Sequence, residues 1–490
     1  MSELELKLRV PDASLASLRN ALRAHGARSV RMRAHYFDTA DGRLARNRVA
    51  LRLRLEGRQW LQTLKTAGVG AVHRLEHEVR VAGSGAGTPT IDLHHHDGSD
   101  AGKLLHAALL TAPTSALAER YATDVSRLRC VVGDGHGGDI EVALDTGHAT
   151  AQARSVALAE LELEHKGGPV QGVFDLAATW IEHGGLWLCT TSKAERGERL
   201  RQRQTVPPAT KARPPQLEQS VDGPALMRAV LQSTLDQVLA NVSDVAEGVT
   251  AAETIHQARV GLRRLRTVLR ELAALSPTIA PEWDGVLAAA FAKLGQRRDE
   301  DVVAAAVRPL LEAASAPTLS WQTRACADPV QAVRDTSFQL TLVAILALAH
   351  AGADRFAPLS PAATRDWLAQ RLNDLHHKVT QDGRRFEQLE LSKQHRVRKR
   401  LKRLRYLAEL TIALWPEDEV KRYLKCTAAA QDALGRHNDV AVAAAAFRAD
   451  AQMQPASWFA AGYLEAHLAV TARAARKALT QVSQADCFWK

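Results

Sequence analysis

Hydrophobic and charged residues alternate with a period of two in several stretches of the first 200 residues. Residues 3–8, 51–56 and 160–165 each alternate leucine with glutamate, arginine, lysine or histidine. Because successive side chains of a strand point to opposite faces, these stretches predict strands with one apolar and one charged face. Helical spacing intervenes at 14–25 and 171–183. This half is therefore predicted to be α+β, with a mainly antiparallel sheet.

The pattern changes after residue 219. Alanine- and leucine-rich stretches then follow helical spacing, and strand signals are nearly absent. The stretch 201–219 between the two patterns carries four prolines among polar and basic residues, which is typical of an exposed, semi-extended linker. We therefore predict an α+β domain at 1–200, a linker at 201–219 and an all-α domain at 220–490.

The helical half contains an internal repeat. Residues 256–266 (HQARVGLRRLR) match 395–405 (HRVRKRLKRLR), and 294–302 (LGQRRDEDV) match 434–442 (LGRHNDVAV). The second motif follows the first at nearly the same offset in both copies, which indicates duplication of a helical unit. The Leu-Gly motifs are interpreted as helix-packing or capping points, with Asp299 and Asp439 orienting basic neighbours.

Each copy carries a stripe of basic residues headed by a histidine. On a helix these residues fall within an arc of roughly 80°, and no acid interrupts either stripe. A solvated helix face usually mixes charges of opposite sign, because like charges at i and i+4 destabilise a helix. Finding the same stripe twice favours a binding surface for a polyanion. The stripes comprise His256, Arg259, Arg263, Arg266 and Arg270 in the first copy, and His395, Arg398, Lys402 and Arg405 in the second.

Composition narrows the partners and the compartment. The net charge of +10 favours polyanions: nucleic acid, anionic lipid or polyphosphate. Aromatic residues are few, at 5%, which leaves little for base stacking and disfavours nucleic acid. The five cysteines form no C-x-x-C pair, so neither a disulfide framework nor a zinc knuckle is expected. The sequence shows no signal peptide, and its longest apolar run (340–351) is too short for a membrane span. We expect a cytoplasmic protein without a membrane partner.

Several of the predicted strands have polar faces made almost entirely of charged residues. If these faces turned inward in a closed sheet, they would line a tunnel carrying both signs of charge. Glutamate oxygens suit Mg²⁺ or Mn²⁺, while arginine and lysine bind phosphates. The alternative is a solvated face with weak cross-strand ion pairs, but its recurrence on four strands favours the tunnel. Further charged residues counted with these faces are Lys65, Arg127, Arg129, Asp145 and Lys193.

Over residues 1–200 the motifs resemble, in order, those of the CYTH domain, or triphosphate tunnel metalloenzyme family. The resemblance implies an eight-stranded antiparallel tunnel that binds a linear triphosphate and a divalent metal ion. It is carried by Glu3-Leu-Glu-Leu-Lys7, Tyr36-Phe-Asp-Thr39, Leu51-Arg-Leu-Arg54, Lys65, Glu76-His-Glu78, Arg127, Ala143-Leu-Asp145, Glu160-Leu-Glu-Leu-Glu164 and Ser192-Lys-Ala-Glu-Arg-Gly197.

This resemblance also implies roles for individual residues. Mg²⁺ or Mn²⁺ would activate a water for in-line attack on a terminal phosphoryl group. The implied metal ligands are Glu3, Glu5, Glu162 and Glu164, and the implied catalytic carboxylates are Glu160, Glu162, Glu164 and Asp145. The implied phosphate contacts are Lys7, Arg52, Arg54, Lys65, Arg127 and Lys193, with Arg129 and Arg196 as further contacts.

The repeated motifs of the helical half resemble the CHAD domain over about residues 220–480. The resemblance implies two pseudo-symmetric four-helix bundles, with a basic channel that binds polyphosphate through the two stripes. Asn438 stands where the first copy has Arg298, so the two copies are not expected to contribute equally.

CYTH domains fused to a helical partner resemble bacterial inorganic triphosphatases, and no aromatic cradle for a base is apparent. The sequence thus predicts metal-dependent hydrolysis of inorganic triphosphate to pyrophosphate and phosphate, with polyphosphate binding by the helical half. The alternative is a non-catalytic adaptor that binds polyphosphate or targets polyphosphate granules. A thiamine triphosphatase and a nucleic-acid binder are the weaker options.

Overall fold

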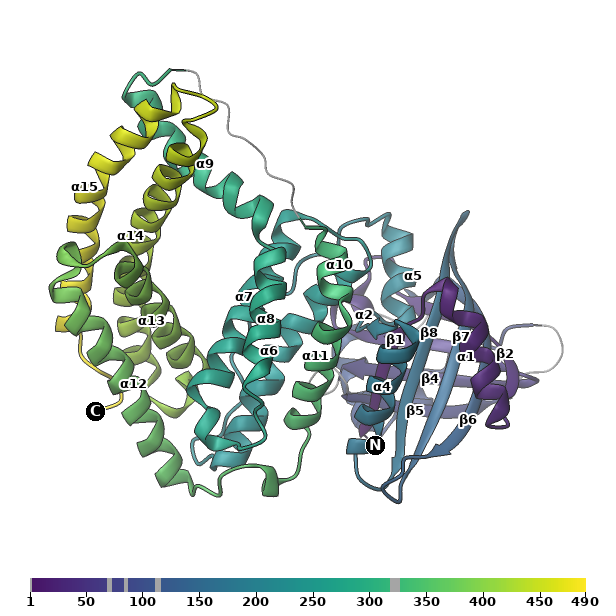
Figure 1. Cartoon of the computed structure of the whole chain (residues 1–490). Coiled ribbons are helices and arrows are strands. Elements are labelled where there is room, and N and C mark those ends of the chain that lie inside the picture. Colours follow the sequence, from purple (N-terminus) through teal and green to yellow (C-terminus); the bar gives the residue numbers. More distant parts are fainter. Residues whose placement is uncertain (1, 68–72, 83–86, 111–115, 318–326) are drawn as a thin grey trace. The chain divides into compact units, whose positions relative to one another are not determined.

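Eight antiparallel strands close into a barrel near the N-terminus (Figure 1). The strand order is β5-β4-β3-β2-β6-β7-β8-β1, and β1 pairs again with β5. A two-residue strand, β9 (Trp187–Leu188), adds to β1. The eight-stranded tunnel prediction is confirmed. Its strands are β1 (Ser2–Arg9), β2 (Arg28–Asp38), β3 (Val49–Glu56), β4 (Gln59–Ala67), β5 (His73–Val81), β6 (Ala118–Gly133), β7 (Asp139–Ala151) and β8 (Arg154–Gly167).

The computed structural model describes residues 2–67, 73–82, 87–110, 116–317 and 327–490, with the backbone alone at 2–3, 67, 73–74 and 296–302. The chain divides into two compact units. The first comprises Met1–Lys211, Leu235–Ala258 and Val333–Ala351, and the second comprises Ala212–Thr234, Arg259–Ala332 and Gly352–Lys490.

Alternation along the strands separates two chemically different faces. Leu8 and Leu161 are cross-strand partners and are fully buried, while Lys7 and Glu162 are partners on the opposite, inner face. The outer face is covered by helices and a core of leucines, among them Leu51 and Leu105. The covering helices are α1 (Leu15–Ala24), α2 (Arg43–Arg46), α3 (Asp100–Leu109) and α4 (Gln171–Gly184).

Helices that follow the proline-rich stretch also belong to the first unit. They are the end of α6 (Gly223–Ala246), the start of α7 (Ala252–Glu271) and α11 (Thr336–Ala349). The apolar run that stands out in the sequence lies in α11, which packs on α4 as a buried core helix. Among the described residues, no helix combines the length and the apolar character that crossing a membrane requires.

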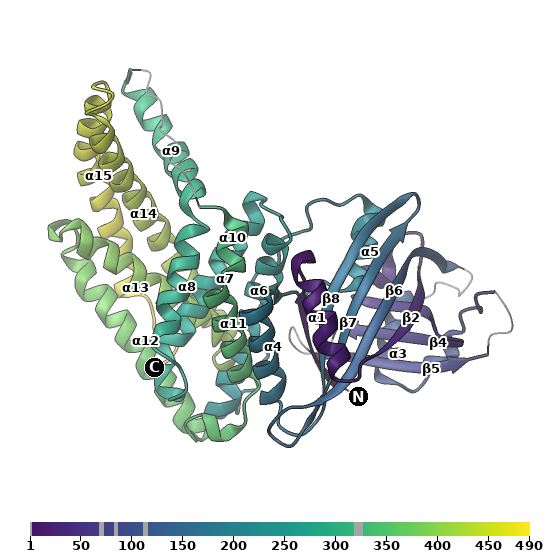
Figure 2. The ribbon, with the colours of Figure 1, turned by 45° about the vertical axis from the view of Figure 1, so that its right-hand side comes forward.

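The second unit is helical, and α12 to α15 run beside one another in it (Figure 2). The repeat falls on equivalent helices: α7 and α13 both span 20 residues. The Leu-Gly motif separates α8 from α9 in the first copy, whereas α14 continues through it in the second. The helices are α8 (Glu282–Lys293), α9 (Gln296–Ala313), α10 (Pro329–Arg334), α12 (Pro361–Arg384), α13 (Leu391–Leu410), α14 (Glu417–Asp450) and α15 (Ser457–Gln484).

The proline-rich stretch after α5 (Lys193–Gln202) contains neither helix nor strand. It is not exposed throughout its length, because Pro207 and Pro215 are buried. The backbone of Thr210 also exchanges two hydrogen bonds with the side chain of Asn241 on α6. The stretch is therefore an extended strap, held in place by the side chain of a helical residue.

Candidate functional site

Glu162 lies on the inner face of the barrel among three cations. Its carboxylate is 2.8 Å from Lys193 Nζ, 2.5 Å from Arg127 Nη2 and 3.4 Å from Lys7 Nζ. Burial would raise the pKa of Glu162, but Lys193, Arg127 and Lys7 hold that pKa well below its usual range. The carboxylate is therefore ionised, and its charge is balanced by groups that could also bind phosphate.

Lys193 reaches this position from the first turn of α5. Ser192 and Glu195 form a capping box, which fixes the start of the helix. Lys193 Nζ lies 2.6 Å from Asp145 and also pairs with Glu160, and both carboxylates are fully buried. Lys193 thus reaches the carboxylates from a helix terminus and not, as its sequence pattern suggests, from a strand face.

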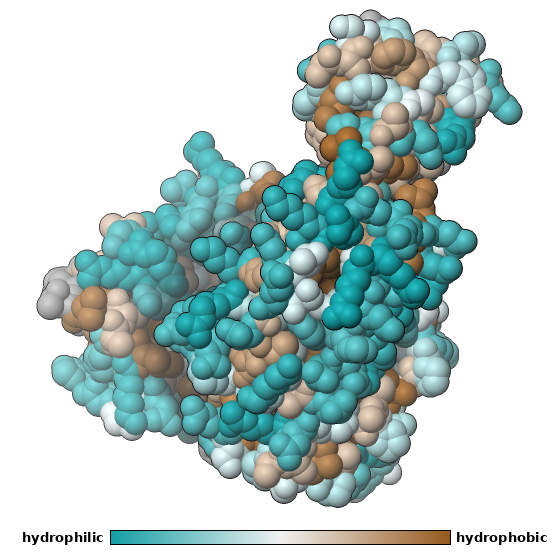
Figure 3. Space-filling model, turned by 90° about the vertical axis from the view of Figure 1, so that its left-hand side faces the viewer, coloured by the Kyte–Doolittle hydropathy of each residue, from teal (hydrophilic) through white to brown (hydrophobic). Residues whose placement is uncertain are grey.

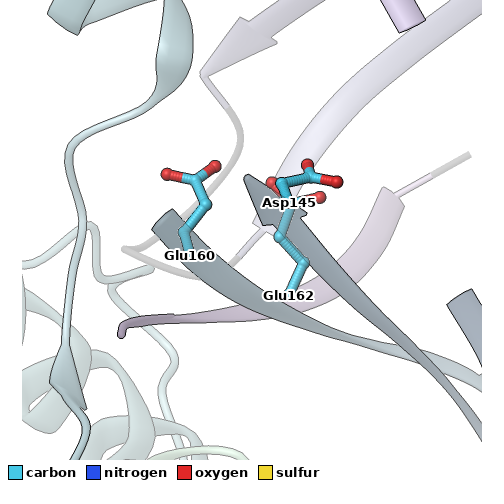
Figure 4. Close-up of side chains that lie close together, drawn as sticks. All are labelled: Asp145, Glu160 and Glu162. Carbon is cyan, nitrogen blue, oxygen red and sulfur yellow. The ribbon is translucent and has the colours of Figure 1, made fainter. Parts of the chain in front are cut away.

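Three carboxylates come together beside Lys193. Asp145, Glu160 and Glu162 each offer an oxygen within 4.8 Å of the others (Figure 4). Asp145 comes from β7 and the two glutamates from the same face of β8. One oxygen, Glu160 Oε2, is buried and has no hydrogen-bond partner among the described residues. A set of oxygen donors with one unused buried acceptor fits a divalent cation such as Mg²⁺ or Mn²⁺.

A second group of charges lines β3, β4 and β5. Lys65 Nζ is 2.7 Å from Glu76, and Arg52 lies 3.8 Å from the same carboxylate. Burial would raise the pKa of Glu76, but Lys65 and Arg52 lower it. Arg54 pairs with Glu78 at 2.8 Å. Three of the cations predicted to contact phosphate, Arg52, Arg54 and Lys65, are thus each already paired with an acid.

The remaining predicted tunnel residues lie in other surroundings. Glu5 is 3.3 Å from Lys7 and is the cross-strand partner of Glu164, which pairs with Lys166. These two acids thus lie side by side, but they are not part of the three-carboxylate cluster. The side chain of Glu3 lies outside the described residues. Arg129 is 45% exposed and pairs with Glu56, and Arg196 pairs at 3.0 Å with Glu247, beyond the end of α6.

In the second unit, the two basic stripes converge. Arg259 and Arg263 of α7 both stack over the ring of Phe291, at 4.5 and 5.1 Å. Arg263 also donates to the hydroxyl of Tyr406 on α13, at 3.3 Å. Burial, together with the nearby charges of Arg263 and Arg398, lowers the pKa of Lys402 to about 6. Like charges from both copies of the repeat are therefore held close together.

A pocket of about 330 Å³ opens beside this convergence. On the face drawn in Figure 3, hydrophilic side chains predominate and apolar ones lie among them. The pocket itself mixes three basic side chains with two carboxylates. Gly295 leaves room nearby, because a Cβ there would lie 2.4 Å from the guanidinium of Arg259. The pocket is lined by Arg398, Lys402, Gln431, Asp432, Gly435, Arg436 and Asp439.

The far ends of both stripes are compensated by acids. Arg266 donates two hydrogen bonds to Asp284 of α8, at 2.8 and 3.2 Å, and Arg270 also pairs with that residue. Arg405 pairs with Glu409 one turn further along α13. The sequence expectation of a fully uncompensated stripe is therefore wrong at these ends, since the acids come from a neighbouring helix or from just beyond the repeat.

The two histidines that head the stripes differ. His395 Nδ1 lies 2.8 Å from Asn438 Oδ1, so the asparagine that distinguishes the second copy orients this ring. His256 belongs to the first unit. The side chains of Arg298 and Asp299, the counterparts of Asn438 and Asp439, lie outside the described residues.

Two domain families account for most of the chain. The CYTH domain matches residues 1–197, which hold the barrel and the start of α5, and the CHAD domain matches residues 229–448. The chain carries a CYTH domain followed by a CHAD domain.

Known proteins resemble parts of the chain. An inorganic triphosphatase of Haemophilus influenzae is 31% identical over 172 residues, which is 34% of this chain and 46% of that protein. This chain therefore spans less than half the length of that relative. The CHAD domain of the plant Ricinus communis is 28% identical, with a TM-score of 0.45, over 56% of this chain and 96% of that one. A Hippeastrum protein reported with a dominant triphosphatase activity is 16% identical, with a TM-score of 0.29, over 42% and 98%.

Some residues of the CYTH site carry no distinct sequence signal. Tyr36 appears only as part of a motif, yet its ring stacks on Tyr121 at 4.7 Å and its hydroxyl accepts from Arg52 at 3.3 Å. Glu247 lies 51 residues beyond Arg196, and nothing in its local sequence predicts that the two side chains pair. The tyrosine could have been found from the period-two pattern of its strand, whereas the glutamate could not.

Proposed function

We propose that the CYTH domain hydrolyses inorganic triphosphate to pyrophosphate and phosphate with the help of Mg²⁺ or Mn²⁺. The observation that carries this proposal is the cluster of Asp145, Glu160 and Glu162 beside Lys193 on the inner face of a closed barrel. Carboxylates for a metal ion and cations for phosphates are the two requirements of phosphoryl transfer. The inorganic triphosphatase of Haemophilus influenzae supports the choice of substrate.

In this proposal the chain's own residues bind and orient the triphosphate. Lys7, Arg52 and Lys65 would bind phosphate oxygens, exchanging their present carboxylate partners for the substrate. Lys193 and Arg127 would neutralise charge that develops next to Glu162. A bound divalent cation would supply Lewis acidity and lower the pKa of a water, and Asp145, Glu160 and Glu162 would hold it.

The CHAD domain is proposed to bind inorganic polyphosphate in the cytoplasm. Arg259, Arg263, Arg398 and Lys402 converge from the two copies of the repeat, and such a density of positive charge suits a flexible chain of phosphates. Binding of polyphosphate would keep phosphate substrates close to the CYTH domain, or would localise the protein where those substrates occur.

Phosphate release from triphosphate, pyrophosphate, ATP and thiamine triphosphate, with Mg²⁺, Mn²⁺ or EDTA, tests the enzyme proposal. We expect metal-dependent turnover that strongly prefers triphosphate. Glu162→Gln should lower kcat by about a hundredfold or more, because it removes the carboxylate that three cations surround.

Glu182→Gln, on the exposed side of α4, is the matched control and should leave turnover unchanged. An absence of turnover with every substrate and metal, while polyphosphate still binds, would replace the enzyme proposal with the adaptor.

A further inference from the structure

The end of α6 is joined to α5 by ion pairs that lie inside the first unit. Arg196 Nη1 is 3.0 Å from Glu247, and Arg199 Nη1 is 2.7 Å from Asp244. Arg9 of β1 approaches Glu247 at 3.6 Å. The side chains of Arg196, Glu247 and Asp244 are 10%, 18% and 8% exposed, so this is a largely buried network rather than a surface pairing.

Further contacts hold the segment that leads into α5. The backbone amide of Thr190 donates to Ser243 on α6 at 3.1 Å, and that of Leu188 donates to Gln339 on α11 at 2.9 Å. Arg334 lies 3.9 Å from the centre of the Trp187 ring and donates to the carbonyl of Ala246, where α6 ends. Residues 187–190 are thus held from both helices immediately before the cap of α5.

The opposite side of α5 rests directly on the barrel. A Cβ at Gly197 would lie 2.1 Å from the ring of Tyr121, so the helix has no room to move closer. Arg154 of β8 donates to the carbonyl of Leu200 at 3.0 Å. The helix α5 is therefore held from both sides. Because Lys193 belongs to its first turn, a displacement of α5 would move Lys193 relative to Asp145 and Glu162, which it contacts at 2.6 and 2.8 Å.

We propose that Glu247 and Asp244 are positioning residues for Lys193. They lie within the span matched by the CHAD domain and outside the span matched by the CYTH domain. Through Arg196 and Arg199 they hold α5 so that the ammonium group of Lys193 stays at the carboxylate cluster. This inference rests on the proposed triphosphatase function for its effect on turnover, but not for its effect on the position of Lys193.

The test uses the full chain with Glu247→Gln, Asp244→Asn and the double variant. Turnover of triphosphate should fall by about tenfold in kcat, because small displacements of a positioned group reduce rates steeply, while KM changes little. Glu247→Asp, which keeps the charge, should restore most of kcat. Glu253→Gln, on an exposed glutamate at the start of α7, is the control and should behave as wild type.

A second measurement needs neither metal nor turnover. Acylation of Lys193 by acetic anhydride in EDTA, followed by mass spectrometry and normalised to exposed Lys103, reports how well the ammonium group is enclosed. We expect Lys193 to react several-fold faster in Glu247→Gln and Asp244→Asn than in wild type or Glu253→Gln. If Glu247→Gln does not fold, Asp244→Asn, which keeps the pair between Arg196 and Glu247, carries the test.

Unchanged Lys193 acylation and unchanged kcat in folded variants would overturn the positioning role. If the wild-type protein hydrolyses no substrate, the triphosphatase proposal is refuted. If Lys193 is nevertheless acylated faster in the variants than in wild type, the positioning role stands. A rise in KM without a change in kcat would also overturn the positioning role, because the network of ion pairs would then serve substrate binding alone.

Discussion

At the scale of single residues, Tyr36 is the least expected feature of the tunnel. Burial would raise the pKa of its phenol, but Arg52, Lys193 and Lys65 lower that pKa below its ordinary value. The hydroxyl therefore lies among the cations proposed to bind phosphates. A phenol in this position can donate a hydrogen bond to a phosphate oxygen that the neighbouring cations hold.

Tyr36→Phe removes this one oxygen and keeps the ring that stacks on Tyr121. We expect kcat/KM for triphosphate to fall by roughly two- to twelvefold, which corresponds to the loss of one hydrogen bond of about 0.5–1.5 kcal/mol, with the melting temperature nearly unchanged. Tyr121→Phe is the matched control. Equal activity of wild type and Tyr36→Phe would show that the hydroxyl does not contact the substrate in the rate-determining complex.

At the scale of elements, the convergence of α7 and α13 couples charge to binding. In the protein without a bound polyanion, Lys402 has a pKa of about 6, so its side chain is mostly neutral at pH 8. A polyanion bound to the stripes would favour its charged form, and the protein should therefore take up a proton on binding. Affinity should rise as the pH falls. At low pH Lys402 is already protonated, so binding no longer requires the free energy of protonating it.

We expect polyphosphate to bind about tenfold more tightly at pH 6.5 than at pH 8. Isothermal titration calorimetry at pH 7.5 in two buffers with different ionisation enthalpies should detect uptake of about one proton. Lys402→Met should abolish most of that uptake, and Lys421→Met, an exposed lysine of α14, should not. Equal proton uptake in Lys402→Met and wild type would contradict this account.

The elements differ in how far the sequence predicts them. Strands such as β1 and β8 are predictable because alternation of leucine and charge is a local pattern, and their register sets Lys7 against Glu162. The contact of Lys193 with Asp145 and Glu160 is harder to predict, because it depends on where the capped start of α5 places the lysine. The compensation of Arg266 by Asp284 is likewise invisible locally, because the acid arrives from the next helix.

At the scale of the whole molecule, the structural units do not coincide with the order of the chain. Alternation and linker composition predict two successive halves, yet the first unit recruits Leu235–Ala258 and Val333–Ala351. Uniform hydrophobicity predicts that α11 is buried, but it does not predict against which core. The core against which α11 packs is set by long-range contacts, such as that of Phe174 with His350.

A fragment ending at residue 211 should therefore be less stable than the first unit of the whole chain. It lacks the helices that cover α4 and hold residues 187–190, so apolar surface around Leu188 and Phe174 would meet water. We expect a lower melting temperature and a stronger tendency to aggregate than for a fragment ending at residue 351, measured by scanning calorimetry and light scattering. Equal melting temperatures for the two fragments would show that α6 and α11 add nothing to the stability of the barrel.

The closure of the barrel through β1 has a consequence during synthesis. This strand is synthesised before the other strands; of its partners, β5 lies about 70 residues later, β8 about 150 residues later and β9 later still. At roughly 5–20 residues per second, β1 waits about 8–30 s for β8. An unpaired strand with one apolar face is a template for aggregation, and alternating charges protect such strands. We therefore expect the glutamates and the lysine of β1 to disfavour aggregation of the nascent chain.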